Sequence, residues 1–300
     1  RKEIFQKEEA FKDENNSREQ IIDIYESLYE PKELIELTDL FKERDQIVPK
    51  KLLIYGRAGI SKTILCNYIS AQWGQEKLWK NEFDAIIHFP LRELASKLHG
   101  ENEIESILGY CIQNTVSTLK QSPALIEKFV WQNRDKILFI LDSYDEIAPF
   151  LSFRNSAHNN LKSFLKTILT NPYIKAIVTT RPMKIEEVDG GSVMFDHILE
   201  NMGFTNKNIV EYVKKFEPNK HEQFIKFLQN NKNILGIAHI PINLEFICDM
   251  WDRLEKKVNS IMISLYNEIT GKLLKRYIEK TAREMDTKDI KILKKTAEKE

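Results

Sequence analysis

The residues best suited to chemistry follow the first apolar run of the chain. That run ends before Gly56, where the sequence GRAGISKT occupies positions 56–63. A phosphate-binding loop has the pattern glycine, four free positions, glycine, lysine, then serine or threonine. Gly56, Lys62 and Thr63 match this pattern, whereas Ser61 stands where the second glycine belongs. The stretch therefore has the form of a phosphate-binding loop with one altered position.

In such a loop, successive backbone N–H groups curl around an anion, and the helix that follows points its positive end at it. Lys62 would reach the β- and γ-phosphates of a nucleotide, and Thr63 would place its hydroxyl on Mg²⁺. Gly59 can take backbone angles that are closed to other residues. Nucleotide contacts are therefore expected from the whole loop: Gly56, Arg57, Ala58, Gly59, Ile60, Ser61, Lys62 and Thr63. Taken alone, the loop also fits a glycine-bearing turn between a strand and a helix.

A second candidate is the acidic sequence LDSYDE, which directly follows five apolar residues, Ile137–Leu141. Such a run delivers Asp142 to the carboxyl end of a strand, where α/β sheets bind ligands. Asp142 could hold Mg²⁺ together with Thr63. Asp145 and Glu146 could orient or deprotonate an attacking water. The alternative is a solvated acidic loop after a core strand, but the glycine loop upstream favours a nucleotide site.

A third candidate is the sequence AIVTTRP, which places Arg181 after another apolar run. A guanidinium at a strand end could sense the γ-phosphate and stabilise charge during phosphoryl transfer. A surface arginine before a proline turn is the alternative, and these residues alone leave both interpretations open.

The elements that must position these residues are indicated by the apolar pattern. Continuous β-rich runs suit a parallel sheet buried on both faces; they lie at Leu52–Tyr55, Ala85–Phe89, Ile137–Leu141 and Ile174–Thr179. Helical patterns at Lys62–Trp73 and Leu161–Leu169 lie between them. This alternation predicts a three-layer α/β domain.

The strand pattern stops after residue 200, where helical spacing takes over. Thr205 has the character of a helix N-cap, and further helical patterns lie at Phe224–Leu228 and Leu244–Trp251. We expect three parts: a helical N-terminal linker at residues 1–45, the α/β domain at 46–200, and an all-helical subdomain at 201–300. Within the linker, a helical pattern covers positions 34–41. Both chain ends fall in mid-pattern, as in a fragment of a longer protein.

Composition excludes several classes of protein. The 300 residues carry 45 basic and 45 acidic side chains, so no net charge favours a dedicated nucleic-acid binder. No apolar run approaches the roughly 18 residues that span a bilayer, and the N-terminus has no signal-peptide core. Cys66, Cys111 and Cys248 are far apart, which favours a reducing compartment over a disulfide framework. The six histidines show no metal-ligand spacing.

Taken in order, these motifs resemble the NACHT domain of the STAND class of P-loop signalling NTPases. The resemblance extends over roughly residues 50–277. Beyond the loop it is carried by the following segments: FDAIIHFPLREL (83–94), LDSYDE (141–146) with small Ser143 after the aspartate, VTTRP (178–182), NMGFT (201–205), AHIPINLEFIC (238–248) and LYNEITGKLLKRY (265–277).

The resemblance implies a nucleotide-dependent switch that binds ATP or ADP with Mg²⁺ and hydrolyses it slowly. Its site would contain Lys62 on the phosphates, Thr63 and Asp142 on Mg²⁺, Asp145 and Glu146 as the hydrolysis acids, Arg181 as the sensor, and Pro241 against the purine. Ser61 departs from the family pattern, and it is expected to weaken binding rather than abolish it.

A switch of this kind rests as a closed, ADP-bound monomer and self-associates on activation. A sensor lies C-terminal to it and an effector N-terminal, both outside this chain. The implied setting is cytoplasmic, in defence-type signalling. Two rivals remain: a degenerate scaffold that does not hydrolyse nucleotide, and a P-loop ATPase of another class, AAA+ or helicase-like.

Overall fold

The computed structural model describes residues 34–44, 46–100, 104–116, 118–152, 158–182 and 195–251, and single positions between 267 and 278. The described residues up to Gly203 form one compact unit, and those from Phe204 onward belong to a second. The predicted domain limits at residues 45 and 200 stay predictions.

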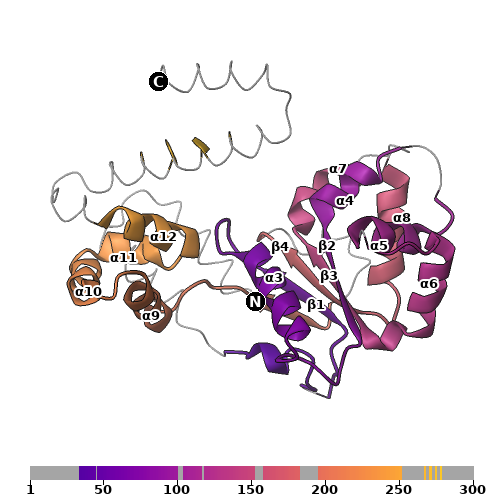
Figure 1. Ribbon diagram of the computed structural model, residues 1–300, viewed down its shortest axis with the longest axis horizontal. Helices are drawn as coiled ribbons and strands as arrows, with labels where there is room; N and C mark the ends of the chain where they lie inside the picture. The colour runs from indigo at the N-terminus through magenta and orange to yellow at the C-terminus, as the bar shows by residue number, and fades with distance from the viewer. Residues whose placement is uncertain are drawn as a thin grey trace, which may run out of the picture. The chain divides into compact units, whose positions relative to one another are not determined.

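A five-stranded parallel sheet forms the centre of the first unit (Figure 1). Its strands are β1 (Lys51–Tyr55), β2 (Ala85–Pro90), β3 (Ile137–Asp142), β4 (Lys175–Thr180) and β5 (His197–Glu200). Their order is β2-β3-β4-β1-β5, and all neighbouring pairs run parallel. The sheet and its helices confirm the predicted α/β class. The sequence did not predict β5, because this edge strand is short and only half-buried and has no continuous apolar run.

The two faces of the sheet bury alternate residues of each strand, as the pleat requires. Leu52 and Ile54 of β1 pack on one face with Cys66 and Ile69. Those two side chains come from α3 (Lys62–Gly74). Leu53 packs on the opposite face. That face is covered by α4 (Leu91–Lys97), α5 (Ile107–Thr115), α6 (Pro123–Gln132) and α8 (Asn159–Leu169) (Figure 1). Because both faces are covered, every residue of β3 is buried.

Short elements connect these layers: η2 (Leu37–Asp39), η3 (Arg134–Lys136), η4 (Tyr144–Glu146) and α7 (Ala148–Ser152). The helical pattern expected at positions 34–41 gives only the 3-10 turn η2. The apolar residues of this segment pack in the core instead. Phe41 contacts Trp79 and Phe83 edge-on, with ring centroids 5.2 and 5.3 Å away. The linker before residue 34 lies outside the described residues.

The second unit is helical wherever its elements are described. It contains α9 (Asn206–Phe216), α10 (His221–Asn230), α11 (Lys232–Ala238) and α12 (Pro241–Asp249), which enclose a separate apolar core. Thr205 caps α9 as predicted: its hydroxyl accepts from the Asn208 N–H at 3.2 Å, and the Asn208 side chain accepts from the Thr205 N–H at 3.0 Å. The segment 265–277 lies mostly outside the described residues. In the described ranges, no helix combines the length and apolar character that crossing a bilayer demands.

Candidate functional site

The glycine loop leaves β1 at Tyr55 and enters α3 at Lys62, as the sequence predicts. Gly56 is required by close packing, because a Cβ there would lie 2.7 Å from the Ile60 side chain and 2.9 Å from the Asn201 carbonyl oxygen. Gly59 has a φ of 77°. Ser61 is also left-handed, with φ 69° and ψ 36°. The serine therefore keeps the backbone conformation of the glycine that the pattern expects.

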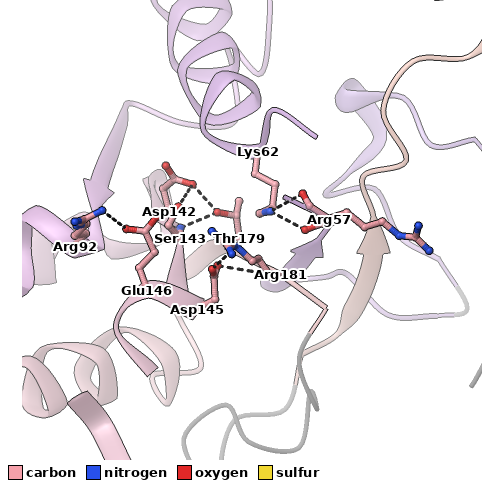
Figure 2. A network of polar contacts seen from close by, with 10 residues as sticks. Arg57, Lys62, Arg92, Asp142, Ser143, Asp145, Glu146, Thr179 and Arg181 are labelled. Atoms are coloured by element: carbon pink, nitrogen blue, oxygen red, sulfur yellow. Dashed lines mark hydrogen bonds and ion pairs between the residues drawn. The ribbon is translucent and has the colours of Figure 1, made fainter. Parts of the chain in front are cut away.

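Lys62 folds its side chain back over this loop (Figure 2). Its Nζ donates to the carbonyl of Gly56 at 2.6 Å and to that of Arg57 at 3.2 Å. Burial lowers the pKa of Lys62, and Asp145 opposes part of that shift. No described residue accepts a hydrogen bond from the backbone N–H of Gly59, Ser61 or Lys62. The loop thus presents unpaired N–H groups and a folded-back ammonium, a donor set that fits phosphate oxygens.

Asp142 is the last residue of β3 and is 3% exposed. Its Oδ1 accepts from the Thr179 hydroxyl at 2.6 Å, and that hydroxyl accepts from the Ser143 N–H at 2.9 Å (Figure 2). Burial alone would raise the pKa of Asp142, but polar contacts with His88, Thr179 and Thr63 outweigh it and lower that pKa to about 2. Asp142 is therefore a carboxylate at neutral pH. Because Thr63 is one of these partners, the two residues expected to hold Mg²⁺ lie together and supply the hard oxygen ligands that fit it.

The two expected hydrolysis acids are both paired with arginines (Figure 2). Asp145 accepts from the Arg181 backbone N–H at 3.1 Å, and its Oδ2 lies 3.0 Å from the guanidinium Nε. Glu146 lies 3.6 Å from Arg92. The Arg181 side chain is 56% exposed and that of Asp145 only 11%. The structure therefore brings Arg181 to the acidic turn after β3, and its role as a sensor stays a prediction.

Other loop residues are placed around this centre. Ile60 is buried, whereas Arg57 and Ala58 are exposed. The Arg57 guanidinium points away from the acidic residues in Figure 2. Pro241 is the first residue of α12 in the helical unit, and its expected purine contact stays a prediction.

Three further residues contribute to the site without having been assigned by sequence. Thr179 and Arg92 lie inside the motifs VTTRP and PLREL, but nothing in those motifs shows which side chain turns toward Asp142 or Glu146. Asn201 follows β5, which was not predicted. Its N–H donates to the Tyr55 carbonyl at 2.8 Å, and its side-chain amide donates to the Ile60 carbonyl at 3.3 Å. Thr179 could have been found from the sequence, because it lies at the end of the predicted strand β4. If β3 and β4 pair in parallel, that end must lie beside Asp142.

Comparison with known families gives one match that covers more than half of the chain. The family model described as the NACHT domain matches residues 50–220. That range contains the glycine loop, the acidic strand end and Arg181, and it continues through α9 to the residue before α10.

Curated relatives carry the same domain in their names. NACHT, LRR and PYD domains-containing protein 12 of Mus musculus is 23% identical over 238 residues, which are 74% of this chain and 20% of that protein. Protein 3 of the same series, from Bos taurus, is 26% identical over 73% of this chain and 21% of its own. Protein 1a of Mus musculus is 26% identical over 83% of this chain and 21% of its own. The chain spans about a fifth of the length of these relatives.

A solved structure gives a more remote likeness. A STAND protein with a tetratricopeptide repeat sensor from Pyrococcus horikoshii aligns with 74% of this chain and 30% of its own, at 13% identity and a TM-score of 0.35. At this TM-score, the two folds do not superimpose closely enough to compare individual side chains.

Proposed function

This chain belongs to the NACHT family of the STAND class of P-loop NTPases, and from that membership we propose that it is a nucleotide-dependent signalling switch. It binds ATP and ADP with Mg²⁺ at the carboxyl ends of β1, β3 and β4. The observation that carries the proposal is the meeting of Lys62, Asp142 and Arg181, from three separate segments, at one edge of the sheet. Family membership also favours this class over an AAA+ or helicase-like ATPase.

The loop from Gly56 to Thr63 would hold the phosphates. Its unpaired N–H groups and the positive end of α3 point to the same place, and anions bind readily at such helix ends. Lys62 already lies over the loop, where its ammonium donates hydrogen bonds to two neutral carbonyl oxygens. A phosphate would give that ammonium a charged partner, and charge-assisted hydrogen bonds of this kind are roughly twice as strong as neutral ones.

Thr63 and Asp142 would hold Mg²⁺. When bound, this ion supplies charge neutralisation to the β- and γ-phosphate oxygens. Asp142 stays ionised because its lowered pKa keeps the proton off at neutral pH. Thr179 fixes the orientation of its carboxylate through the hydrogen bond to Oδ1.

Hydrolysis would use Asp145, Glu146 and Arg181. In this structure the Arg181 Nε lies 3.0 Å from Asp145, and the other N–H donors of the guanidinium could meet an anionic group. More than half of its side chain is exposed, which leaves it free to turn. Glu146 is held by Arg92 over a longer distance, and this loosely paired carboxylate is the better placed of the two to accept a proton from water.

A second candidate function is a scaffold that holds nucleotide without turning it over. Two observations favour it: Ser61 replaces the loop glycine, and both acids are engaged with arginines. The two functions share the same binding residues and differ only in hydrolysis.

The remaining parts of the proposal rest on the family alone. Self-association on activation, defence-type signalling, a cytoplasmic setting, and sensor and effector domains elsewhere in the protein are proposals for the whole molecule, of which this chain is expected to be one part.

Nucleotide binding is tested by calorimetry of the chain with ADP and with ATP in the presence of Mg²⁺. We expect Lys62→Ala to remove measurable binding, because it deletes the only side-chain cation of the loop that lies over the phosphate position. Lys166→Ala is the matched control, since it removes an exposed lysine of α8 far from the loop in sequence. Unchanged affinity in Lys62→Ala, or no binding by the parent chain, would refute the proposal.

The same samples separate the switch from the scaffold. Conversion of Mg-ATP to ADP by the parent chain, lost in Glu146→Gln, supports a slow hydrolase. Tight binding without any conversion supports the scaffold.

A further inference from the structure

Three side chains that can ligate a metal meet between the sheet and α3. Cys66 lies on the buried side of α3, and His88 and Asp142 come from β2 and β3. Alternation of side chains explains the meeting: Ile86 of β2 and Ile140 of β3 pack with Cys66 in one core cluster, and residues two positions further along each strand share that face. One ligand atom from each of Cys66, His88 and Asp142 lies within 4.8 Å of the other two.

The separations suit a small tetrahedral ion. The Cys66 Sγ lies 3.7 Å from Asp142 Oδ1, and the His88 Nε2 lies 3.8 Å from Asp142 Oδ2. Zinc bonds of about 2.0–2.3 Å in a tetrahedral arrangement separate ligand atoms by about 3.4–3.6 Å. The two distances involve different oxygens of Asp142, and the three ligand atoms taken one per residue lie within 4.8 Å of one another. Rotamer adjustments that bring them to tetrahedral separations would close these three side chains around one ion, and solvent would complete the fourth position.

The site has an unsatisfied group and a fixed ligand. His88 Nε2 is buried and makes no hydrogen bond. The Asp142 carboxylate lies 3.8 Å away, close enough for an electrostatic contact but too far for a hydrogen bond. A buried nitrogen left in this state destabilises the folded chain, and a metal bond would give it a partner. Asp142 is already oriented by the hydrogen bond from Thr179, and hydrogen bonds of this kind hold the ligands of metal sites in place.

Charge also favours occupation by a divalent ion. Without metal, the Cys66 S–H donates a hydrogen bond to Asp142 Oδ1 at 3.7 Å. When an ion binds, that proton leaves to solvent and the thiolate takes its place. One thiolate, one carboxylate and one neutral imidazole then balance a divalent cation, and the buried centre has no net charge.

We propose that Cys66, His88 and Asp142 form a binding site for Zn²⁺. A soft thiolate and an imidazole are ligands that suit zinc, whereas magnesium prefers oxygens. This site could not be predicted from the sequence, because its ligands come from three different elements and lack the short spacings of common zinc motifs.

Zinc at this site would compete with the nucleotide. Asp142 is shared, since it is also the expected Mg²⁺ residue; this consequence rests on the proposed function, whereas zinc binding itself does not. An ion held by Cys66 and His88 draws the Asp142 carboxylate away from Thr63. Zinc is then an inhibitor of Mg-nucleotide binding.

The metal site is tested first without nucleotide. The tag-free, metal-stripped chain is titrated with Co²⁺, which reports thiolate ligation by an ultraviolet charge-transfer band and tetrahedral geometry by intense visible bands. We expect one equivalent of Co²⁺ to produce both, and Zn²⁺ to displace it. Absence of the thiolate band in the folded parent chain overturns the proposal.

Variants assign the ligands. Cys66→Ser and His88→Gln should each weaken binding by more than the about 10–100-fold that losing an outer-shell partner costs, and Cys66→Ser should abolish the thiolate band. Cys111→Ser is the matched control, because Cys111 is also a buried free cysteine but belongs to the opposite core face. A band that survives Cys66→Ser, or disappears in Cys111→Ser, assigns the metal elsewhere and refutes this site. Circular dichroism confirms that each variant is folded.

Competition is measured last, as the affinity for Mg-ADP with and without Zn²⁺. Zinc should weaken Mg-ADP binding in the parent chain and have no effect in Cys66→Ser. A chain that gives the cobalt spectrum but binds no nucleotide keeps the zinc site and loses the proposed function. A chain that binds Mg-ADP and gives no cobalt spectrum keeps the proposed nucleotide binding and refutes the zinc site.

Discussion

Two serines hold left-handed backbone conformations, one on each turn that carries the candidate site. Ser61 has a φ of 69° directly before α3, and Ser143 has a φ of 64° directly after β3. A residue with a Cβ pays about 1–2 kcal/mol for this conformation. Strain of this kind is found where a turn must keep its shape for binding. At Ser61 the required shape is that of a phosphate-binding loop. Serine in place of the expected glycine therefore changes the side chain but keeps the left-handed backbone conformation.

Ser61→Gly should therefore stabilise the chain and improve its site. Glycine removes the left-handed strain but gives the unfolded chain more freedom, which leaves a net gain of up to about 1 kcal/mol. Urea unfolding without nucleotide measures this gain. Affinity for Mg-ADP should rise as well, because the loop can approach phosphate more closely without the Cβ.

Ser61→Ala is the control for both effects, since it removes the hydroxyl and keeps the strain. If alanine raised affinity as much as glycine does, the hydroxyl rather than the backbone would limit binding. If neither variant altered affinity, serine would be fully tolerated and the weakened-site interpretation would be wrong.

At the scale of elements, the strands were predictable because they are buried on both faces. β1, β2, β3 and β4 each begin and end within one residue of the expected runs. Burial of that kind leaves a continuous apolar signal in the sequence. β5 is an edge strand with three half-buried residues and one exposed, so it leaves no such signal. The helix expected at positions 34–41 failed for a related reason, because Phe41 is apolar to pack in the core and not to line a helix face.

The site was predictable only as far as single segments allow. Strand ends placed Lys62, Asp142 and Arg181 correctly, since parallel strands align their carboxyl ends. Pairings between segments were not predictable: the contact between Arg92 and Glu146 joins two elements that sequence spacing cannot bring together. The same holds for Thr179 and Asp142, whose hydrogen bond depends on how β3 and β4 pair.

A buried lysine opens β1 and makes the strand sensitive to pH. Lys51 is 6% exposed, and its ammonium donates to the Ile174 carbonyl. Burial lowers the pKa of Lys51 to about 8 from 10.5, and Asp196 offsets part of that effect. Between these two pH values, the unfolded chain holds a proton that the folded chain has lost. Raising the pH through this window therefore stabilises the folded state. Below pH 8, burial of the charged ammonium destabilises the folded state to its full extent.

Lys51→Met should remove this dependence. Since one pKa unit corresponds to about 1.4 kcal/mol, the unfolding free energy of the parent chain should rise relative to that of the variant by up to about 3 kcal/mol from pH 7.5 to 10.5. Urea unfolding at both pH values measures the difference. Parallel pH profiles of the two chains would show that Lys51 keeps an ordinary pKa in the folded state.

At the scale of the whole molecule, the chain has two units with separate cores. The residues proposed to bind phosphate all belong to the first unit, whereas Pro241 opens α12 in the second. A nucleotide held by both would couple them, because a ligand that binds only one arrangement of the two units stabilises that arrangement. Substitution of Pro241 therefore tests the proposal that the helical unit takes part in nucleotide binding.

Pro241→Ala should weaken Mg-ADP binding by about tenfold, or about 1.4 kcal/mol, if the ring lies against the purine. Pro123→Ala is a matched control, since Pro123 also opens a helix, α6, within the first unit. Calorimetry of both variants makes the comparison. Equal affinities in the two variants would place the purine away from α12.

The strand order has a consequence for how the protein is made. β1 is synthesised first, yet its partners are β4 and β5, and Lys51 pairs with Ala176 and Leu52 with His197. As the chain leaves the ribosome, β2 and β3 can pair with each other while both neighbours of β1 are still unmade. The apolar strand before the candidate phosphate-binding loop must therefore stay unpaired at least until β4 has been made. Exposed segments of this kind are where chaperones act and aggregation begins.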